Sequence, residues 1–548
     1  MRWWGWGDDE HAGVLDAPAQ RLLRDELGIG GEVRGPVALD EVELPEPRLS
    51  DSVLDRLRGA CELRVDREAR VLHAAGKGYI DLVRLRAGRP EGAPDAVALP
   101  TTPEEVGAVL EACTAERVAV VPFGGGTSVV GGVSPVAAGF ERVLSLDLGG
   151  LHRLVRVDER SLTVTVEGGL GALELEAALG ARGLTLGHFP QSFEYVTIGG
   201  CVATRSAGQA STGFGRIDEL VVGLRCRAPA GELALPVVPA SAAGPDLREL
   251  LVGSEGALGV ITEATLRVRR RAPSERYEAW MMPSFAAGVE ALRALEQAGA
   301  APDVTRLSDP EETRLSLAMS GAAEGRRGQL LGGYLRLRRV GGGACLAILG
   351  WAGDEGAIGA RRVRAVEVMR REGGAGLGAA PGRAWERSRY HGPYLRDHLL
   401  DRGVLAETLE TATTWSNLFA LYVAVGDALR DALGARGTPP LVGCHISHLY
   451  SAGASLYFTF LARQERGAEA EQWEAAKRAA SEAIVAAGGT ITHHHAIGRD
   501  HVDYLEAEDG ALGLQALRAV KEELDPAGIM NPGKLLASAG HVARSGSP

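Results

Sequence analysis

The segment that begins at Ala96 has the clearest alternation of hydrophobic and polar positions in the chain. Its sequence, VALPTTPEEVGAVLEACTAERVAVVPFGGGTS, predicts a strand, a helix, a second strand and a glycine-rich loop. Thr102 is a preferred N-cap residue and Pro103 suits the first helical position, so the helix has a defined start. The pattern therefore predicts an α/β unit that opens onto a glycine loop.

Further strands are predicted from runs of β-branched residues at 142–148, 161–167 and 259–268, with a helix at 172–182. These elements favour an α+β domain. Ahead of them, the first ninety residues contain one helix-like stretch at 18–27 among polar and proline-containing segments. We interpret this part as an N-terminal extension.

Beyond Pro273 the pattern changes to amphipathic helices that alternate with β-like runs at 344–351 and 455–462. This change predicts a second domain. The last segment, 500–536, is predicted to be helical and to end in DPAGIMNPGK, where prolines and glycines enforce turns.

The composition agrees with a multidomain globular protein. The chain has 548 residues, more than one core usually organises, and its net charge of -12 argues against a general nucleic-acid binder. Six scattered cysteines without a C-x-x-C pair favour a reducing compartment. The N-terminus lacks the apolar core of a signal peptide, and no window approaches 18 uncharged apolar residues, so we expect a cytoplasmic protein.

The glycine loop is PFGGGTSVVGG, residues 122–132. Such a loop can turn backbone N–H groups towards an anion, because glycine permits positive φ and has no side chain to hold a pyrophosphate away. It matches neither G-x-G-x-x-G nor the G-K-[ST] ending of a P-loop, which argues against a nicotinamide cofactor or a nucleoside triphosphate. A tight structural turn is the alternative interpretation.

Two more segments rich in small residues follow, PQSFEYVTIGGCVATRSAG (190–208) and GSEGALGVI (253–261). Each allows a close approach of the backbone. Three such segments in one domain indicate a long, extended dinucleotide ligand.

The histidine cluster THHH occupies residues 492–495. On an extended segment, alternation would put His493 and His495 on one face and His494 on the other. A metal site would need a third ligand, and no recognised zinc spacing is present, so no metal is expected. A structural cluster and an acid/base or anion-binding role both stay open.

The three small-residue segments resemble the FAD-binding domain of the vanillyl-alcohol-oxidase superclass. The resemblance implies that the first holds the pyrophosphate, the second lies along the ribityl and isoalloxazine part, and the third closes on the adenosine side. Because Thr127 and Ser128 stand where a tethering His or Cys would be expected, it implies a non-covalent FAD. The implied cofactor-binding residues are Pro122, Gly124, Gly125, Gly126, Thr127, Ser128, Gln191, Ser192, Thr197, Gly199, Gly200, Thr204, Glu255, Gly259, Val260 and Ile261.

Within that superclass the chain is most similar to the alkyldihydroxyacetonephosphate synthase family, from end to end. The motifs that carry this resemblance are MRWWGWG (1–7), PDVTRLSD (302–309), PYLRD (393–397), ETATTW (410–415), SAGASLYF (451–458) and the triple histidine, which is followed by Ala496 where the family commonly has glycine.

The resemblance implies an enzyme that exchanges the acyl group of acyl-dihydroxyacetonephosphate for a fatty alcohol through a flavin–substrate adduct, without net redox change. By the same resemblance Tyr457 is the acid/base, and His494 and His495 serve proton transfer and adduct stabilisation. Arg306 assists as a further catalytic residue, while Arg396 and His493 bind the substrate phosphate and its surroundings. A guanidinium matches phosphate geometry, and a Tyr or His can move the proton.

Other interpretations remain. Without the resemblance, Tyr457 would be a core aromatic residue and Arg396 a surface ion pair with Asp397 or Asp401. An FAD-dependent dehydrogenase or oxidase of a 2-hydroxy acid such as D-lactate is the alternative function. A flavin carrier without catalysis is the third.

The predicted fold class is α+β, with a two-subdomain FAD-binding domain of the p-cresol methylhydroxylase (PCMH) type and an α/β cap domain whose antiparallel sheet is flanked by helices. The predicted division is 1–90 as the partly helical extension, 91–272 as the FAD-binding domain, 273–490 as the cap or substrate domain, and 491–548 as a segment that returns the histidines to the FAD domain. A small-molecule substrate, a homodimer and peripheral membrane contact are expected, with no nucleic-acid partner.

Overall fold

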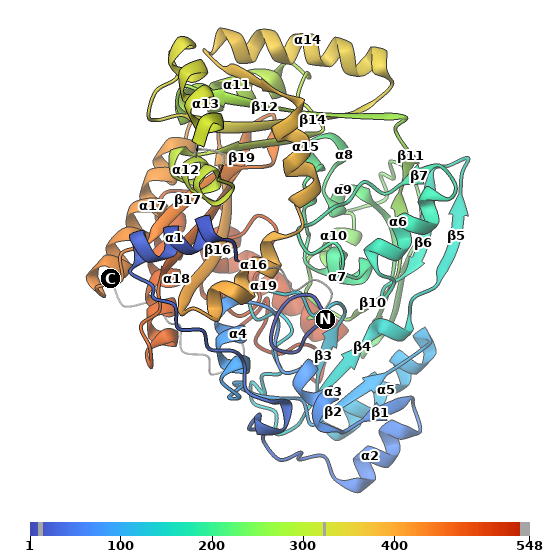
Figure 1. Cartoon of the computed structure of the whole chain (residues 1–548). Coiled ribbons are helices and arrows are strands. Elements are labelled where there is room, and N and C mark those ends of the chain that lie inside the picture. Colours follow the sequence, from blue (N-terminus) through green and yellow to red (C-terminus); the bar gives the residue numbers. More distant parts are fainter. Residues whose placement is uncertain (9–14, 322–324, 538–548) are drawn as a thin grey trace.

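The structure is a computed structural model that describes residues 1–8, 15–321 and 325–537. Three main β-sheets organise it (Figure 1). The first has the order β1-β2-β4-β3, with β1 antiparallel to β2 and the other neighbours parallel. Its strands are β1 (Glu62–Arg64), β2 (Ala96–Leu99), β3 (Ala119–Phe123) and β4 (Val143–Asp147).

The second sheet is antiparallel throughout, with the order β5-β6-β10-β8-β9. Together with the first sheet it forms the lower and right-hand part of Figure 1. Its strands, and the small ribbon β7–β11 beside it, are β5 (Leu154–Asp158), β6 (Thr163–Glu167), β7 (Leu184–Thr185), β8 (Val221–Ala228), β9 (Gly231–Leu235), β10 (Val260–Arg267) and β11 (Arg269–Arg270).

The third sheet belongs to the predicted cap domain and has eight antiparallel strands in the order β15-β12-β14-β13-β17-β19-β16, with β18 paired to β19. In Figure 1 it occupies the upper left, with helices α14 and α11 above it and α17 and α18 beside it. Its strands are β12 (Ser274–Met282), β13 (Val304–Ser308), β14 (Cys345–Gly353), β15 (Ala375–Gly378), β16 (Val404–Thr414), β17 (Leu441–Ile446), β18 (Leu449–Tyr450) and β19 (Gly453–Arg463).

The helices cover these sheets with their apolar faces. The largest core cluster lies in the cap, where buried residues of α11, α17 and α18 pack with the inward side chains of the third sheet, Phe458 and Phe460 among them. The helices are α1 (Ala17–Leu27), α2 (Asp51–Arg58), α3 (Arg67–Leu72), α4 (Tyr79–Arg86), α5 (Pro103–Glu116), α6 (Ala172–Gly180), α7 (Ile198–Ala203), α8 (Ser211–Phe214), α9 (Ile217–Leu220), α10 (Arg248–Leu251), α11 (Phe285–Gln297), α12 (Pro310–Met319), α13 (Gly325–Leu337), α14 (Glu355–Arg371), α15 (Ala379–Ser388), α16 (Gly392–Leu400), α17 (Leu418–Ala435), α18 (Glu469–Ala486) and α19 (Leu505–Leu524), with 3-10 turns η1 (Leu39–Glu41), η2 (Leu148–Gly150) and η3 (Val502–Tyr504).

The end of the chain returns to the first sheet. After α19 the backbone runs parallel to β3, where the amide of Val120 donates to Ile529 and the amide of Asn531 donates to Val120, both at 2.8 Å. Ile529 and Met530 are fully buried in the core of this sheet. The carboxyl-terminal segment thus lies against an element more than 400 residues away in sequence.

The beginning of the chain contacts both the first sheet and the predicted cap domain. β1 is the edge strand of the first sheet, although the sequence pattern assigned residues 62–64 to an extension. The first residues are held by two buried charged side chains: Lys77 donates to the carbonyls of Arg2 and Trp3, and the amide of Trp6 donates to Asp397. Among the described residues, no helix has the length and apolar character needed to cross a membrane.

The predicted α/β unit is confirmed, including its cap: the Thr102 hydroxyl accepts from the amide of Glu105 at 3.1 Å. The predicted helix of the last segment is present as α19, and the turns expected in DPAGIMNPGK follow it. α19 covers only Leu505–Leu524 and is interrupted at Gly510, whose φ of 71° leaves the helical region. It ends because Asp525 accepts from the amides of Ile529 and Met530 and so folds the chain into a turn.

Candidate active site

The glycine loop after β3 packs against the second small-residue segment. A side chain at Gly124 would collide with the Thr197 hydroxyl, and one at Gly125 with the carbonyl of Tyr195. Gly126 has a φ of 66°, which glycine adopts without strain. These contacts require glycine at three successive positions, and so explain the motif without any ligand present.

The second segment continues as α7, whose start is fixed by side-chain and backbone hydrogen bonds. The Thr197 hydroxyl accepts from the amide of Gly200 at 3.3 Å, and the Thr204 hydroxyl donates to the carbonyl of Gly200 at 2.9 Å. The amide of Gly199 donates to Gly168 at 2.7 Å. The backbone of α7 therefore lies against the second sheet, near β6 and β10.

The third segment joins the other two through Glu255. Its amide donates to Ala203 at 2.8 Å, and the side chain of Asn531 bridges the carbonyls of Glu255 and Gly132. The three segments named from the sequence thus converge at one place. The small residues at that place fit a dinucleotide whose pyrophosphate needs close backbone contact.

Individual cofactor candidates differ in what they contact. Pro122 packs on Gly256, while the Ser128 hydroxyl accepts from the amide of Gly132 at 2.9 Å and is thus used within the loop. Gln191 is exposed and donates to the carbonyl of Arg389 at 2.6 Å. The remaining candidates lie in the same three segments: Thr127 in the loop, Ser192 before α7, and Gly259, Val260 and Ile261 at the start of β10.

The cap sheet places Tyr457 in the middle of a polar cluster. On β19 it lies opposite Glu410 of β16 and His445 of β17. Its ring stacks on His445 with centroids 4.8 Å apart, and lies 5.9 Å from the ring of His494 and 5.6 Å from that of His495. Burial raises the pKa of Tyr457, so the phenol stays protonated at neutral pH.

Glu410 organises the histidine segment. This carboxylate, only 2% exposed, accepts from the backbone amides of three successive residues, His493, His494 and His495, and from the Thr492 hydroxyl at 2.7 Å. Burial by itself would raise the pKa of Glu410, but the histidines and the hydroxyl hold it well below the ordinary value. The segment therefore curls around an ionised carboxylate.

This curl overturns the expectation of alternating histidine faces. The segment is not a strand, and adjacent rings contact each other: His493 and His494 have centroids 5.1 Å apart, and His494 and His495 4.7 Å. Both His494 and His495 face Tyr457. Extended geometry is lost because all three amides turn inward to one acceptor.

The histidines are neutral. Burial lowers the pKa of His493 and His494 to about 3, and that of His495 to about 4, although Glu410 acts in the opposite direction. A neutral imidazole has one nitrogen that donates and one that accepts. Each ring can therefore accept a proton from a group such as Tyr457.

Arg306 does not touch the Tyr457 ring directly: the ring of His445 lies between them. The guanidinium pairs with Glu312 and donates to Nε2 of His445 at 3.1 Å, while Nδ1 of His445 donates to Glu312 at 3.0 Å. Burial raises the pKa of Glu312, but the pairing with His445 and Arg306 lowers it by more, so that the pKa falls to about 2. The triad fixes the ring on which Tyr457 stacks.

Arg396 extends from α16 towards the same cluster. It is not a surface ion pair: its side chain is 12% exposed, lies 3.7 Å from Glu407 and donates to the carbonyl of Lys77 at 3.1 Å. Its positive charge acts on Tyr457 and His495.

Four residues of this cluster have no role in the sequence-based prediction: Glu410, His445, Glu312 and His448. Glu410 and His445 lie on strands whose alternation of apolar and polar residues is visible in the sequence. A single carboxylate or histidine in an apolar strand does not indicate which residues it will contact. His448 is stacked on His493 at 4.9 Å. The contacts of Glu410 with the histidine segment, of Glu312 with His445 and of His448 with His493 join residues 45 or more positions apart and arise only in the folded protein.

Comparison with known proteins agrees with this geometry. A model described as "FAD binding domain" matches residues 94–234, and one described as "FAD linked oxidases, C-terminal domain" matches 271–535. The alkyldihydroxyacetonephosphate synthase of Dictyostelium discoideum is 32% identical and is aligned over 98% of this chain and 93% of its own length. That of Trypanosoma brucei brucei is 33% identical, over 98% and 92%.

The chain belongs to the alkyldihydroxyacetonephosphate synthase family. A solved alkyldihydroxyacetonephosphate synthase structure superposes with a TM-score of 0.84 at 29% identity, and the match covers 98% of this chain and 99% of the other. A substrate-bound p-cresol methylhydroxylase, at 13% identity and a TM-score of 0.62 over 91% and 100%, shares the fold. The predicted PCMH-type fold class, the FAD cofactor and the assignment as a flavoenzyme are thereby confirmed. The domain boundaries and individual site residues stay predictions.

Proposed function

We propose that this family member exchanges the acyl group of acyl-dihydroxyacetonephosphate for a long-chain alcohol. The observation that carries the proposal is the contact of Tyr457 with two neutral histidines beside a guanidinium, in a chain similar over its full length to enzymes named for this synthesis. In the exchange the ester oxygen leaves with the fatty acid and the alcohol oxygen takes its place, so one proton is released.

The proposed roles follow from protonation. Tyr457 carries a proton at neutral pH, and His494 and His495 have unprotonated nitrogens, so a proton can pass between the phenol and an imidazole as the substrate carbon is activated. The FAD supplies an electron-accepting ring when bound, held without a covalent bond by the candidates in 122–128, 191–204 and 255–261. Glu410 keeps both imidazoles facing Tyr457.

The arginines are proposed to hold the phosphate. Arg396 uses one guanidinium nitrogen on the carbonyl of Lys77 and lies 3.7 Å from Glu407, a separation too long for a strong bond. Its other donors suit a phosphate oxygen. Arg306 is engaged by Glu312 and His445, so we propose that it acts near the substrate by positioning His445; His493 borders the same space.

A second candidate function is the oxidation of a 2-hydroxy acid. The match of residues 271–535 to the C-terminal domain of FAD-linked oxidases favours it. In that case the arginines would bind a carboxylate, and a neutral histidine would remove the hydroxyl proton.

One experiment separates the two functions. The flavin spectrum of the purified holoenzyme is recorded anaerobically before and after addition of palmitoyl-dihydroxyacetonephosphate, and in parallel after D-lactate. The proposal expects loss of the oxidised-flavin band only with the acyl ketone, recovery on addition of hexadecanol, and an ether-linked product by mass spectrometry. Bleaching only with D-lactate would support the dehydrogenase instead.

We also propose that α13 contacts the membrane that supplies the lipid substrates. Its Leu330 and Leu337 are 74% and 80% exposed, and Arg326, Arg336, Arg338 and Arg339 are exposed around them. Apolar side chains flanked by cations suit a surface of anionic lipids. The cytoplasmic location and the homodimer stay predictions, the latter to be measured by light scattering.

A further inference from the structure

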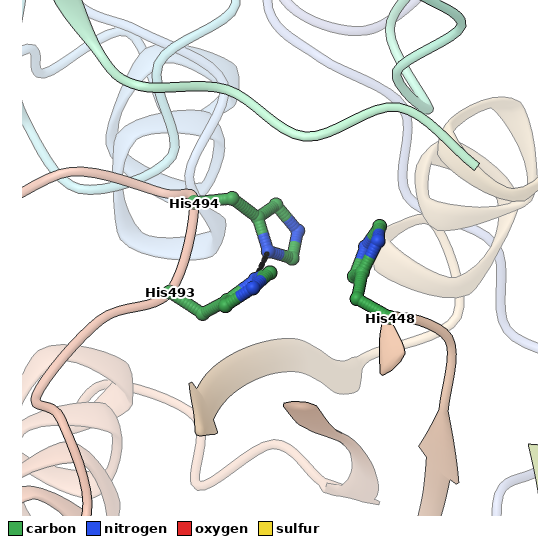
Figure 2. Close-up of side chains that lie close together, drawn as sticks. All are labelled: His448, His493 and His494. Atoms are coloured by element: carbon green, nitrogen blue, oxygen red, sulfur yellow. Dashed lines mark hydrogen bonds between the residues drawn. The ribbon is translucent and has the colours of Figure 1, made fainter. Parts of the chain in front are cut away.

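Three histidines from two distant segments meet beside the proposed active site. His448 stands between β17 and β18, and His493 and His494 belong to the segment held by Glu410. Figure 2 shows the three rings turned towards a common space. One ring nitrogen from each lies within 4.8 Å of the other two, and the Nδ1 atoms of His493 and His494 are 2.9 Å apart.

The cluster contains a nitrogen that nothing in the described residues satisfies. Nδ1 of His448 is buried and has no hydrogen-bond partner, in a side chain only 4% exposed. A buried polar atom left without a partner costs free energy, so it indicates a missing partner. The backbone around His448 is fixed, since it exchanges hydrogen bonds with Ser455.

The hydrogen bonds of the rings suit a metal ion. The Nε2 atom of His493 is hydrogen-bonded to the Tyr450 hydroxyl at 2.6 Å, which fixes that ring. Its Nδ1 atom is hydrogen-bonded to Nδ1 of His494, and a bound ion would replace that bond. Glu410 and Asp218 offset the positive charge of Arg216 beside the cluster.

The spacing also fits. With metal–nitrogen bonds of about 2.0–2.1 Å, tetrahedral ligand atoms lie on the order of 3.4 Å apart. The Nδ1 atoms of His493 and His494 are 2.9 Å apart and the candidate ligand atoms all lie within 4.8 Å of one another, limits between which that value falls. Imidazoles favour zinc, copper, nickel and iron over magnesium or calcium.

We propose that His448, His493 and His494 form a binding site for one first-row divalent transition-metal ion of the zinc class. Three protein ligands are the number found in catalytic zinc sites, which leave a fourth position for water or substrate. An ion on Nδ1 of His494 places that ring's proton on Nε2, so His494 would then donate, and His495 would be the imidazole that accepts the proton from Tyr457. This assignment rests on the proposed function, whereas ion binding does not.

The test is zinc binding by the FAD-loaded protein after removal of metals with EDTA. Isothermal titration calorimetry and elemental mass spectrometry are expected to give one zinc ion per chain. His448→Asn is expected to weaken binding at least 100-fold while flavin content and thermal midpoint are kept. His501→Asn is the matched control, because His501 is also buried but bonds to the carbonyl of Ala496.

The proposed site is overturned if the wild type binds no zinc, or if His448→Asn binds zinc with the same affinity as the wild type. If His448→Asn loses its flavin, X-ray absorption of the zinc-loaded wild type decides: three imidazole ligands support the site, and one or none overturns it. Because these readouts need no substrate, a failure here is distinguishable from a failure of the proposed exchange reaction.

Discussion

At the scale of single residues, the Glu410 carboxylate accepts more hydrogen bonds than any other described side chain of the candidate site. It is buried on β16 and receives hydrogen bonds from four consecutive residues of a segment 82 to 85 positions away. A charge that deep in the protein is stable only while those donors face it. The position of the histidines therefore depends on one carboxylate.

Glu410→Gln is expected to lower kcat about 10²- to 10³-fold, with a smaller change in KM, because a glutamine amide cannot accept from all these donors. Steady-state kinetics of the ether-forming reaction measure it, with flavin content as the check on folding. Glu508→Gln is the matched control, since Glu508 is exposed and also accepts from this segment, at Thr490 and Ile491. Equal losses in both variants would contradict the role of Glu410.

Tyr457→Phe keeps the ring that stacks on His445 and removes only the hydroxyl. If Tyr457 carries the proton, kcat should fall about 10²- to 10⁴-fold while the thermal midpoint stays within a few degrees. The control is Tyr422→Phe, whose hydroxyl donates to Asp309 within the cap. A Tyr457→Phe enzyme with more than a tenth of wild-type activity would exclude the acid/base assignment.

The pKa values of the histidines make a prediction about pH. Because the folded values, about 3 for His494 and about 4 for His495, are lower than 6.5, these groups stay neutral down to about pH 4 and are lost as bases only when the pH falls through that value. We therefore expect His494 and His495 to contribute no limb to the pH profile of kcat between pH 5.5 and 7.5. An acidic limb with an apparent pKa near 6.5 would show that the bases are not buried as described.

At the scale of elements, Glu255 ties the histidine segment to the FAD-binding half. Its carboxylate accepts from the amides of Ile497 and Gly498, at 2.8 and 2.7 Å. Burial raises the pKa of Glu255 to about 7, and the two amides act against that rise. The loop that carries the proposed proton-transfer groups is thus attached to a loop proposed to border FAD.

Glu255→Ala leaves both amides buried without an acceptor, at a cost of about 1–3 kcal/mol each. We expect a lower thermal midpoint and FAD binding weakened at least tenfold, measured by flavin fluorescence in a titration of the apoprotein. Glu263→Ala on β10 is the control, because Glu263 is only partly buried. Unchanged FAD affinity in Glu255→Ala would contradict the coupling of the two loops.

The sequence predicted the elements better than the contacts between them. The cap of α5 at Thr102 and the glycines at 124–126 follow local rules of propensity and backbone conformation, and both are present. The arrangement of the histidines could not be predicted, because it depends on an acceptor on β16 that is more than 80 residues away. His448 was missed for the same reason: its partners come from another segment, and no spacing motif links them.

At the scale of the whole molecule, the net charge of -12 would repel anionic lipids, so membrane contact needs a local surface such as α13. Leu330→Glu with Leu337→Glu is expected to reduce sedimentation with phosphatidylserine-containing vesicles at least fivefold. Leu512→Glu, at a side chain 77% exposed on α19, is the control. Activity on a water-soluble short-chain substrate should not change, and equal vesicle binding by all variants would exclude this surface.

The pairing of residues 529–531 with β3 has a consequence for how the protein is made. β3, the strand that leads into the glycine loop, pairs with β4 and also with residues 529–531 from the last part of the chain. During synthesis on the ribosome, the FAD-binding half therefore stays incomplete until the entire cap has been made. Cofactor loading is then a late event, and the cap sheet has to fold beside an unfinished partner.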